Sequence, residues 1–380
     1  MSKLFSNILP HFYITSSRFY LPLVLLISLT SIASASITIP TVTVGDAGNT
    51  ADDTFDEFGL YYGSVAYEYQ IGKYEVTNKQ YTDFLNAVAS TDTYSLYNSN
   101  MVIARSGLDG SYSYSVSSFD ANKPVNYVSF WDAARFANWL TNGQPTGSQD
   151  SSTTEDGAYT LTTVGIDNNT VTRGDWYDAD VGNTSSETVS AIASRAEWYK
   201  AAYYNGDGGY YDYATQSNTA PTAEAPPGDR NSANYDYATG EEVTQVGAYK
   251  NSESHYGTFD QSGNVEEWND TIIYGRLGGR GTGGGPFDLP ASSLQPSSLG
   301  GATPTSEGDY RGFRVTSLAP VRFFSPQFQS GSGGTVCPTG ASDYPAGTEV
   351  TVTAIPDAGY IFHSWSGSVS GTDPQITVTL

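Results

Sequence analysis

The sequence predicts an α+β domain with little regular secondary structure, followed by a small all-β module. Hydrophobic residues make up 38% of the 380 residues, which is enough for a core, and the chain contains 29 Tyr and 40 Gly. A core of aromatic rings joined by glycine-rich connections is more typical of a loop-rich domain than of a helical bundle. Short helices with capping signals come first along the chain, and alternating strands follow near its end.

The first 35 residues are predicted to be a secretory signal peptide. Lys3 and Arg18 give it a basic start, and residues 21–29 (LPLVLLISL) form an apolar stretch that is too short to span a bilayer comfortably. Residues 33–35 (ASA) form a small-residue cleavage signal. An uncleaved N-terminal anchor is the alternative. We therefore expect a secreted or cell-envelope protein with no membrane span after cleavage.

The charge of the mature chain excludes one class of partner. Signal removal takes away two of the 17 basic residues and none of the 40 acidic ones, which leaves a net charge of −25. Such a surface repels phosphate backbones, so nucleic-acid binding is not expected. The same charge can attract divalent cations, although solubility alone is a sufficient explanation for it.

Two strands and a helix open the main domain. Residues 36–45 and 67–76 are rich in apolar and β-branched residues with strand-like alternation. Thr77 and Gln80 then form a capping box, which predicts the start of a helix. The residues that follow with helical spacing are Tyr81, Phe84, Leu85 and Val88.

Two further helices are predicted by the same signal. Ser129 with Asp132 and Ser194 with Glu197 are capping boxes, and Gly143 marks the end of the first of these helices. The segments between the predicted elements lack periodicity. They are expected to be ordered loops, hairpins and turns: residues 90–123, 143–190 and 205–241.

The last part of the chain has a different sequence pattern. Residues 319–332 are predicted to be a linker, and residues 333–380 a small β module. The sequence ends inside a predicted strand, so we expect the module to be truncated. Its predicted strands cover residues 348–355, 360–365 and 375–380.

Five sequence blocks, read in order, resemble the formylglycine-generating enzyme and sulfatase-modifying factor family. The third block, SRAEW, lacks the Leu-Pro usual in the family. The resemblance covers residues 36–318 and implies a C-type-lectin-like α+β fold. Residues 333–380 resemble the internalin-type B-repeat, a module of bacterial surface proteins. The blocks are residues 72–81 (GKYEVTNKQY), 124–133 (PVNYVSFWDA), 194–198 (SRAEW), 257–268 (GTFDQSGNVEEW) and 311–315 (RGFRV).

The residues that the family's oxidases need are missing. In those enzymes two cysteines bind copper as soft thiolate ligands and attack a substrate cysteine. The resemblance places them between residues 281 and 311, where this chain has no cysteine, and its single cysteine, Cys337, lies in the repeat. We therefore predict no catalytic or cofactor-binding residue, and we do not expect the protein to be an enzyme.

A metal-dependent oxidoreductase, related to the formylglycine-generating enzymes or their nonheme-iron relatives, is the alternative. The iron-dependent relatives use a cluster of histidines. After signal removal only His255 and His363 remain, in different predicted domains, so a three-histidine site cannot be built. Copper and iron are therefore not expected as cofactors.

The fourth block implies a structural calcium site instead. Ca²⁺ prefers carboxylate and carbonyl oxygens, and Gly263 supplies the tight turn that such a site needs. An Asp–Gly turn with a core-facing Trp268 is the simpler alternative. Glu266 replaces the aromatic residue usual in the family. The implied metal ligands are Asp260, the carbonyl oxygens of Gly263 and Val265, and Glu267.

These observations predict a secreted or cell-envelope protein that resembles sulfatase-modifying factors but lacks the catalytic cysteine pair. We expect it to be a calcium-stabilised binding or structural module. Its Tyr- and Asn-rich loops are suited to contact with a glycan or a protein at the cell surface. The sequence does not identify that ligand.

Overall fold

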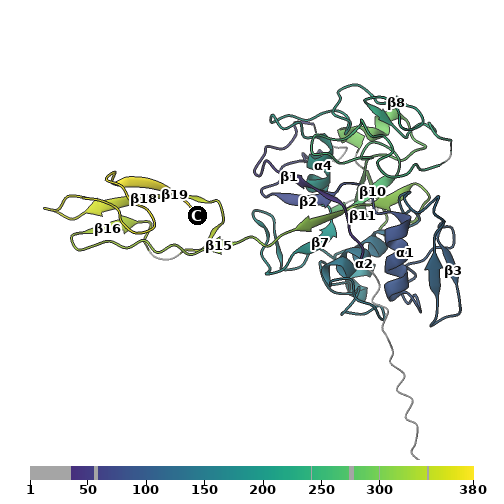
Figure 1. The fold of residues 1–380 in the computed structure, drawn as a ribbon, viewed down its shortest axis with the longest axis horizontal. Coiled ribbons are helices and arrows are strands. Elements are labelled where there is room, and N and C mark those ends of the chain that lie inside the picture. Colours follow the sequence, from purple (N-terminus) through teal and green to yellow (C-terminus); the bar gives the residue numbers. More distant parts are fainter. Residues whose placement is uncertain (1–35, 55–58, 241, 274–277, 299, 340–341) are drawn as a thin grey trace, which may run out of the picture. The chain divides into compact units, whose positions relative to one another are not determined.

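The computed structural model describes residues 36–380, apart from residues 55–58, 241, 274–277, 299 and 340–341 (Figure 1). The predicted signal peptide, residues 1–35, lies outside the described residues. A main domain extends to Leu318, and a small β module follows it from Phe323. Within the described part of the chain, no helix is both long and apolar enough to cross a membrane.

The three predicted helices of the main domain begin at their predicted caps. The side chains of Thr77, Ser129 and Ser194 each accept a hydrogen bond from the backbone N–H three residues later. In return, the backbone N–H of each capping residue donates to the side chain of that later residue. These reciprocal bonds satisfy N–H groups that the first helical turn leaves free. A further short helix lies where we predicted hairpins and loops. The helices are α1 (Asn78–Val88), α2 (Phe130–Thr141), α3 (Thr163–Asp167) and α4 (Arg195–Tyr203).

The first sheet joins the beginning of the main domain to its end. The strand order is β1-β2-β14-β7, and neighbouring strands are antiparallel. Ile71 on β2 lies opposite Val42 on one side and Thr316 on the other. The two strands predicted at the start of the domain are confirmed, although both are shorter than predicted. The strands are β1 (Thr41–Val44), β2 (Tyr69–Gly72), β7 (Val189–Ile192) and β14 (Val315–Leu318).

The second sheet runs through the middle of the main domain, and we did not predict it. Figure 1 shows β10 and β11 between α4 and the pair α1 and α2. The order is β12-β11-β10-β13, and β10 pairs in parallel with β13. The pairing of β10 with β11 shifts register between Trp268 and Ile272, which marks a bulge. The strands are β10 (Glu266–Ile273), β11 (Gly279–Gly283), β12 (Gly300–Ala302) and β13 (Arg311–Phe313).

The loop regions contain short strand pairs and 3₁₀ turns rather than long irregular coil. The pair β3–β4 is a hairpin in the segment 90–123, β5–β6 lies in the segment 143–190, and β8–β9 lies in the segment 205–241. These elements are β3 (Ala104–Ser106), β4 (Ser113–Ser115), β5 (Tyr177–Asp178), β6 (Gly182–Asn183), β8 (Thr222–Ala223), β9 (Ser232–Ala233), η1 (Ala291–Leu294) and η2 (Pro296–Ser298).

The core of the main domain is built from aromatic rings, as its composition predicts. Phe136 on α2 packs edge-to-face against Phe84 on α1 and Phe313 on β13, with ring centroids 5.3 and 5.4 Å apart. A second buried cluster lies between α4 and the first sheet and includes Tyr69 and Trp198. Such ring pairs add to the stabilisation from apolar burial. The two clusters enclose β10, which carries the residues described below.

The β module has its own small core. Val336, Val350 and Val352 are buried together in an antiparallel sheet with the order β16-β18-β19. The strands predicted over residues 348–355 and 375–380 are confirmed as β18 and β19. The strands of the module are β15 (Phe323–Phe324), β16 (Gly334–Cys337), β17 (Tyr344–Pro345), β18 (Glu349–Pro356) and β19 (Gln375–Thr379).

One predicted strand of the module is wrong, and the predicted linker contains a strand. Residues 360–365 form no extended strand; Trp365 makes a single bridge to Gly371. Tyr360 N donates to Asp357 O, which closes a turn, and Ile361 is 91% exposed, so its side chain does not face a core. In the stretch predicted as a linker, β15 pairs with β17.

Candidate functional site

A fully buried ion pair lies at the centre of the main domain. Glu267 on β10 and Arg314, which follows β13, have side chains without exposed surface. Arg314 Nε lies 2.5 Å from Glu267 Oε2, and Arg314 Nη2 lies 2.6 Å from Oε1. The indole N–H of Trp198 on α4 also donates to Oε2, at 2.7 Å. Two parallel charge-assisted hydrogen bonds fix the orientation of both charged groups.

Arg314 also holds two distant backbone segments. Its Nη1 donates to the carbonyl oxygen of Gly72 at 2.9 Å, and its Nη2 donates to that of Phe259 at 2.8 Å. Gly72 ends β2, and Phe259 directly precedes Asp260. One guanidinium group therefore connects the first sheet to the segment in which we predicted a calcium site.

Two more carboxyl groups lie beside this ion pair. Asp260 Oδ2 accepts a hydrogen bond from Gly247 N at 2.6 Å, and Glu75 Oε1 accepts one from Asn264 Nδ2 at 2.8 Å. The Asp260 carboxyl group lies close enough to Glu75 for its charge to raise the pKa of Glu75. The other Glu75 oxygen, Oε2, is buried, and no hydrogen-bond donor within the described residues reaches it. A proton shared with Asp260, or a cation, would satisfy this oxygen.

The electrostatics of the carboxyl cluster favour uptake of positive charge. Burial raises the pKa of Glu75 well above its ordinary value, and the charges of Asp260 and Glu267 raise it further. Burial also raises the pKa of Asp260 to about 6, although the Gly247 N–H and the Arg314 charge act in the opposite direction. Three carboxyl groups thus share one guanidinium group, which leaves excess negative charge in the interior when all of them are ionised.

The four residues predicted to ligate calcium lie in one continuous segment at the start of β10. Asp260 and Gly263 have positive φ angles of 64° and 96°, so the chain turns sharply before it enters the strand. Val265 and Glu267 are fully buried. In the part of the chain that the structure describes, no three His, Cys, Asp or Glu side chains are arranged as a metal site. The calcium site therefore stays a prediction.

Sequence reasoning missed Glu75 as a member of this cluster. The residue lies in the first family-like block, between Tyr74 and Val76 at the end of a predicted strand. A carboxylate next to a buried apolar residue is a weak signal, since charged residues at the ends of strands are common. Glu75 and its partner Asn264 are 189 residues apart in the sequence, so their contact depends on the tertiary fold.

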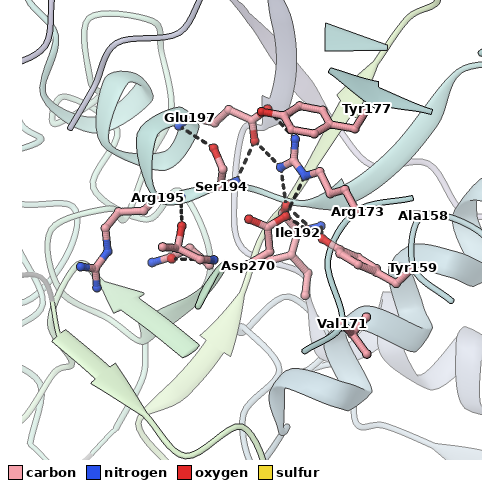
Figure 2. Close-up of polar contacts among 12 residues, drawn as sticks. Ala158, Tyr159, Val171, Arg173, Tyr177, Ile192, Ser194, Arg195, Glu197 and Asp270 are labelled. Carbon is pink, nitrogen blue, oxygen red and sulfur yellow. Dashed lines mark hydrogen bonds and ion pairs between the residues drawn. The ribbon is translucent and has the colours of Figure 1, made fainter. Parts of the chain in front are cut away.

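A second polar network surrounds Arg173, in a segment that we predicted only as hairpins and loops (Figure 2). Arg173 Nε donates to Asp270 Oδ2 at 2.7 Å, and Nη1 and Nη2 donate to the two oxygens of Glu197 at 2.9 and 2.5 Å. Burial opposes ionisation of Glu197, but the charge and hydrogen bonds of Arg173 lower its pKa. Tyr159 also donates to Asp270 Oδ2, at 3.0 Å.

The network borders an open depression of about 440 Å³ on the main domain. Asp270 reaches it from the bulge of β10, and Ser194 reaches it from the N-terminal cap of α4. Bulges often redirect side chains next to functional sites. Nothing in the sequence analysis pointed to this place, because its residues come from three separate segments.

The stretch in which the resemblance places the catalytic cysteines contains a different set of contacts. Arg311 pairs with Glu266, which replaces the family's aromatic residue, with Nη2 2.6 Å from Oε2. Its Nη1 donates to Ser306 Oγ at 2.8 Å, and the guanidinium group lies 4.8 Å from the Trp268 ring centroid. Cys337 is exposed on β16 of the β module.

Comparison with known families gives two matches along the chain. The model of the sulfatase-modifying factor enzyme 1-like domain matches residues 37–318. The model of the divergent InlB B-repeat domain matches residues 326–380. Both agree with the resemblances drawn from the sequence blocks. No curated protein matches the sequence significantly.

Several solved structures resemble the chain at low sequence identity. Treponema denticola variable protein 1 is 18% identical, with a TM-score of 0.46, and the match covers 74% of this chain and 97% of that one. CarF is 20% identical, with a TM-score of 0.47 and coverage of 75% and 99%. PvdO from Pseudomonas aeruginosa is 16% identical, with a TM-score of 0.44 and coverage of 73% and 93%.

Proposed function

Because the chain belongs to the family of sulfatase-modifying factor enzyme 1-like domains, we propose that it is an exported, non-catalytic member that acts as a calcium-stabilised binding or structural module of the cell envelope. The observation that carries the calcium part is the carboxyl cluster of Glu75, Asp260 and Glu267, of which Glu75 and Glu267 are buried and Asp260 is partly buried, and which shares a single guanidinium group. Export rests on the signal-like pattern of residues 1–35.

The cysteine content supports a role without catalysis. The family's oxidases need two thiolates as copper ligands, and carboxylate or hydroxyl groups do not replace a soft ligand for Cu(I). The chain has one cysteine, Cys337, which lies outside the family match at residues 37–318. Arg311, at the end of the family's cysteine-bearing stretch, forms an ion pair with Glu266, and neither residue is a soft metal ligand.

The chemistry of the carboxyl cluster fits calcium. Asp260, Glu267 and the carbonyl oxygens of Gly263 and Val265 would hold the ion. Calcium is a hard cation that is bound by several such oxygens. Glu267 accepts three hydrogen bonds, from Trp198 and twice from Arg314, whereas a carboxylate has about four acceptor positions. It can therefore keep its ion pair and still contribute to a cation site.

Calcium titration of the purified full chain tests this proposal. A bound ligand stabilises the folded state by about 2.7 kcal/mol at a concentration 100 times its Kd. For a domain of this size we expect calcium to raise Tm by roughly 5 °C or more over the chelator-treated protein, and magnesium to raise it less. Asp260→Ala should abolish the calcium effect.

A matched control separates a ligand from a merely buried acid. Asp132 is a buried acid whose pKa, like that of Asp260, is raised, but it belongs to the capping box of α2, so Asp132→Asn should leave the calcium-dependent rise in Tm intact. An unchanged Tm of the wild-type protein in calcium would show that the metal part is wrong. Stoichiometric copper or iron in the purified protein would instead favour the oxidoreductase alternative.

A further inference from the structure

The open depression beside Arg173 is lined by both apolar side chains and a carboxylate. The half-buried ring of Tyr177 and the side chain of Ile272 supply apolar surface. Asp270 also lines the depression, and its carboxyl group accepts hydrogen bonds from Arg173 and Tyr159 (Figure 2). At about 440 Å³, the depression lies within the size range of small-ligand sites, which join apolar walls to a few oriented polar groups.

Three hydroxyl groups line the same depression. Thr172 precedes Arg173, Ser194 caps α4, and Thr271 follows Asp270 on β10. Ser194 Oγ accepts from Glu197 N at 3.1 Å and Thr271 Oγ1 accepts from Arg195 N at 3.1 Å. Because these bonds use only acceptor positions, both hydroxyl groups keep a donor for a ligand.

The charge of the site argues against an anionic ligand. Arg173 faces two carboxylates, Glu197 and Asp270, so the three groups together carry a charge of −1. Four N–H bonds of Arg173 point to protein acceptors: one at Asp270, two at Glu197 and one at the Ile192 carbonyl. The guanidinium group is thus committed to orienting carboxylates, and a negatively charged ligand would meet net repulsion.

Asp270 presents an acceptor for which the described residues provide no donor. Its Oδ2 accepts from Arg173 and Tyr159, whereas Oδ1 receives no hydrogen bond from the described part of the chain. The Asp270 side chain is 10% exposed and lines the depression, while the hydrogen bonds of Arg173 and Tyr159 to Oδ2 fix the position of the carboxyl group. A fully apolar ligand would bury the carboxylate without a donor, which is unfavourable.

We infer that this depression binds a neutral sugar ring, with two ring hydroxyl groups bound by Asp270 and its neighbouring hydroxyl side chains, and the apolar face of the sugar against Tyr177 and Ile272. A pyranose has closely spaced hydrogen-bond donors and acceptors on its edge and C–H groups on its faces. Because the sugar is neutral, the protein does not have to supply an opposite charge. The inference rests on the proposed binding role and names its ligand class.

Binding of a panel of methyl pyranosides tests this inference. Saturation-transfer difference NMR on the calcium-loaded full chain would compare methyl glucosides, galactosides, mannosides and N-acetylglucosaminides with n-butylammonium. We expect at least one pyranoside to bind and to lose roughly tenfold or more in affinity in Asp270→Asn, which removes a charged acceptor. The melting temperature of the Asp270→Asn variant would be measured in parallel, because the loss of the pairing between Asp270 and Arg173 can also destabilise the fold.

A second variant leaves the network intact. Thr172 is exposed at the rim, so Thr172→Trp should fill the depression and abolish binding, whereas Thr93→Trp, at another exposed threonine, should not. Binding of no pyranoside, binding of butylammonium in their place, or equal pyranoside binding by Thr172→Trp would each overturn the inference. Each result can occur while calcium still stabilises the protein, so failure here is distinguishable from failure of the calcium proposal.

Discussion

Glu267 and Arg314 form a bidentate ion pair in which neither side chain has exposed surface. Glu267 belongs to the GNVEEW block and Arg314 to the RGFRV block, 47 residues later. The same two residues contact α4 through Trp198 and β2 through Gly72. The ion pair therefore connects both sheets and one helix of the main domain.

Removal of one partner of this pair should be strongly destabilising. Glu267→Gln leaves the Arg314 charge buried without its partner, and such a loss costs about 3–5 kcal/mol. We expect Tm to fall by roughly 10 °C in a differential scanning calorimetry experiment. The double variant Glu267→Leu with Arg314→Met should be no less stable than either single variant, because the two charges that pair with each other are removed together. Additive losses would contradict this account.

The stability of the calcium-free protein should fall as the pH rises from about 4 to about 6. Burial raises the pKa of Asp260 from its ordinary value to about 6, and it also raises the pKa of Glu75 well above its ordinary value. The folded state therefore holds protons that the unfolded state has already released, so its advantage is complete below about pH 4 and is lost through pH 6. Urea unfolding at a series of pH values measures the slope.

Calcium and a substitution provide the controls for this pH dependence. Calcium should flatten the slope, because the cation replaces the proton in the carboxyl cluster. Asp260→Asn should reduce the slope in the absence of calcium. Burial also raises the pKa of Asp132, to about 7, so Asp132→Asn should remove a separate contribution that calcium does not affect. Stability that rises with pH in the chelator-treated protein would be inconsistent with the protonated cluster.

We expect any residue other than glycine at position 263, in the turn before β10, to destabilise the protein. Gly263 has a φ of 96°, and a Cβ atom there would overlap the carbonyl oxygen of Asn234. Gly263→Ala combines backbone strain with a steric clash and should cost about 3 kcal/mol or more. Gly110 has a similar φ of 83° but open space around it, so Gly110→Ala should cost only about 1 kcal/mol. Equal effects of the two variants on Tm would show that the clash is relieved.

The helices could be predicted because their signals are local. Thr77, Ser129 and Ser194 each lie three residues before the side chain that completes the cap. The first sheet could be predicted only in part, since its two early strands alternate clearly. In contrast, β10 carries Glu267, Asn269 and Asp270 in its interior, a polar pattern that does not resemble a central strand. Arg314 and Arg173 compensate the charges of Glu267 and Asp270, and the sequence does not place these arginines beside them.

The candidate sites follow the same division. The resemblance of residues 257–268 to the family pointed to Asp260 and Glu267, because a family resemblance implies tertiary contacts that residue spacing alone does not. The position of Glu75 beside these two residues became visible only in the folded structure. The depression beside Arg173 could not be predicted, since Arg173 and Asp270 are 97 residues apart. Residues 360–365 illustrate the opposite error: they alternate like a strand, yet the turn that Tyr360 closes leaves Ile361 exposed.

The single thiol should be reactive and dispensable. Cys337 is exposed on β16, so Ellman's reagent should label one thiol per chain without denaturant. Cys337→Ser should leave the calcium-dependent Tm and pyranoside binding unchanged, because the residue lies outside the main domain. If this variant lost one of these properties, the assignment of the corresponding site to residues 36–318 would be wrong.

Arg173 should matter far more to stability than an arginine on the surface. Its side chain is 4% exposed and bridges Glu197 and Asp270, so Arg173→Met leaves two buried carboxylates without their cation and should cost about 3–5 kcal/mol. Arg105 is 34% exposed and pairs with Asp92 at 3.5 Å, so Arg105→Met should cost about 1 kcal/mol or less. Urea unfolding of both variants compares them directly. Lowering the pH should narrow the gap between them, because Arg173 lowers the pKa of Glu197 and the stability that this pairing gives is lost once Glu197 is protonated. A gap that stays constant with pH would mean that Arg173 stabilises the fold through packing rather than through its charge.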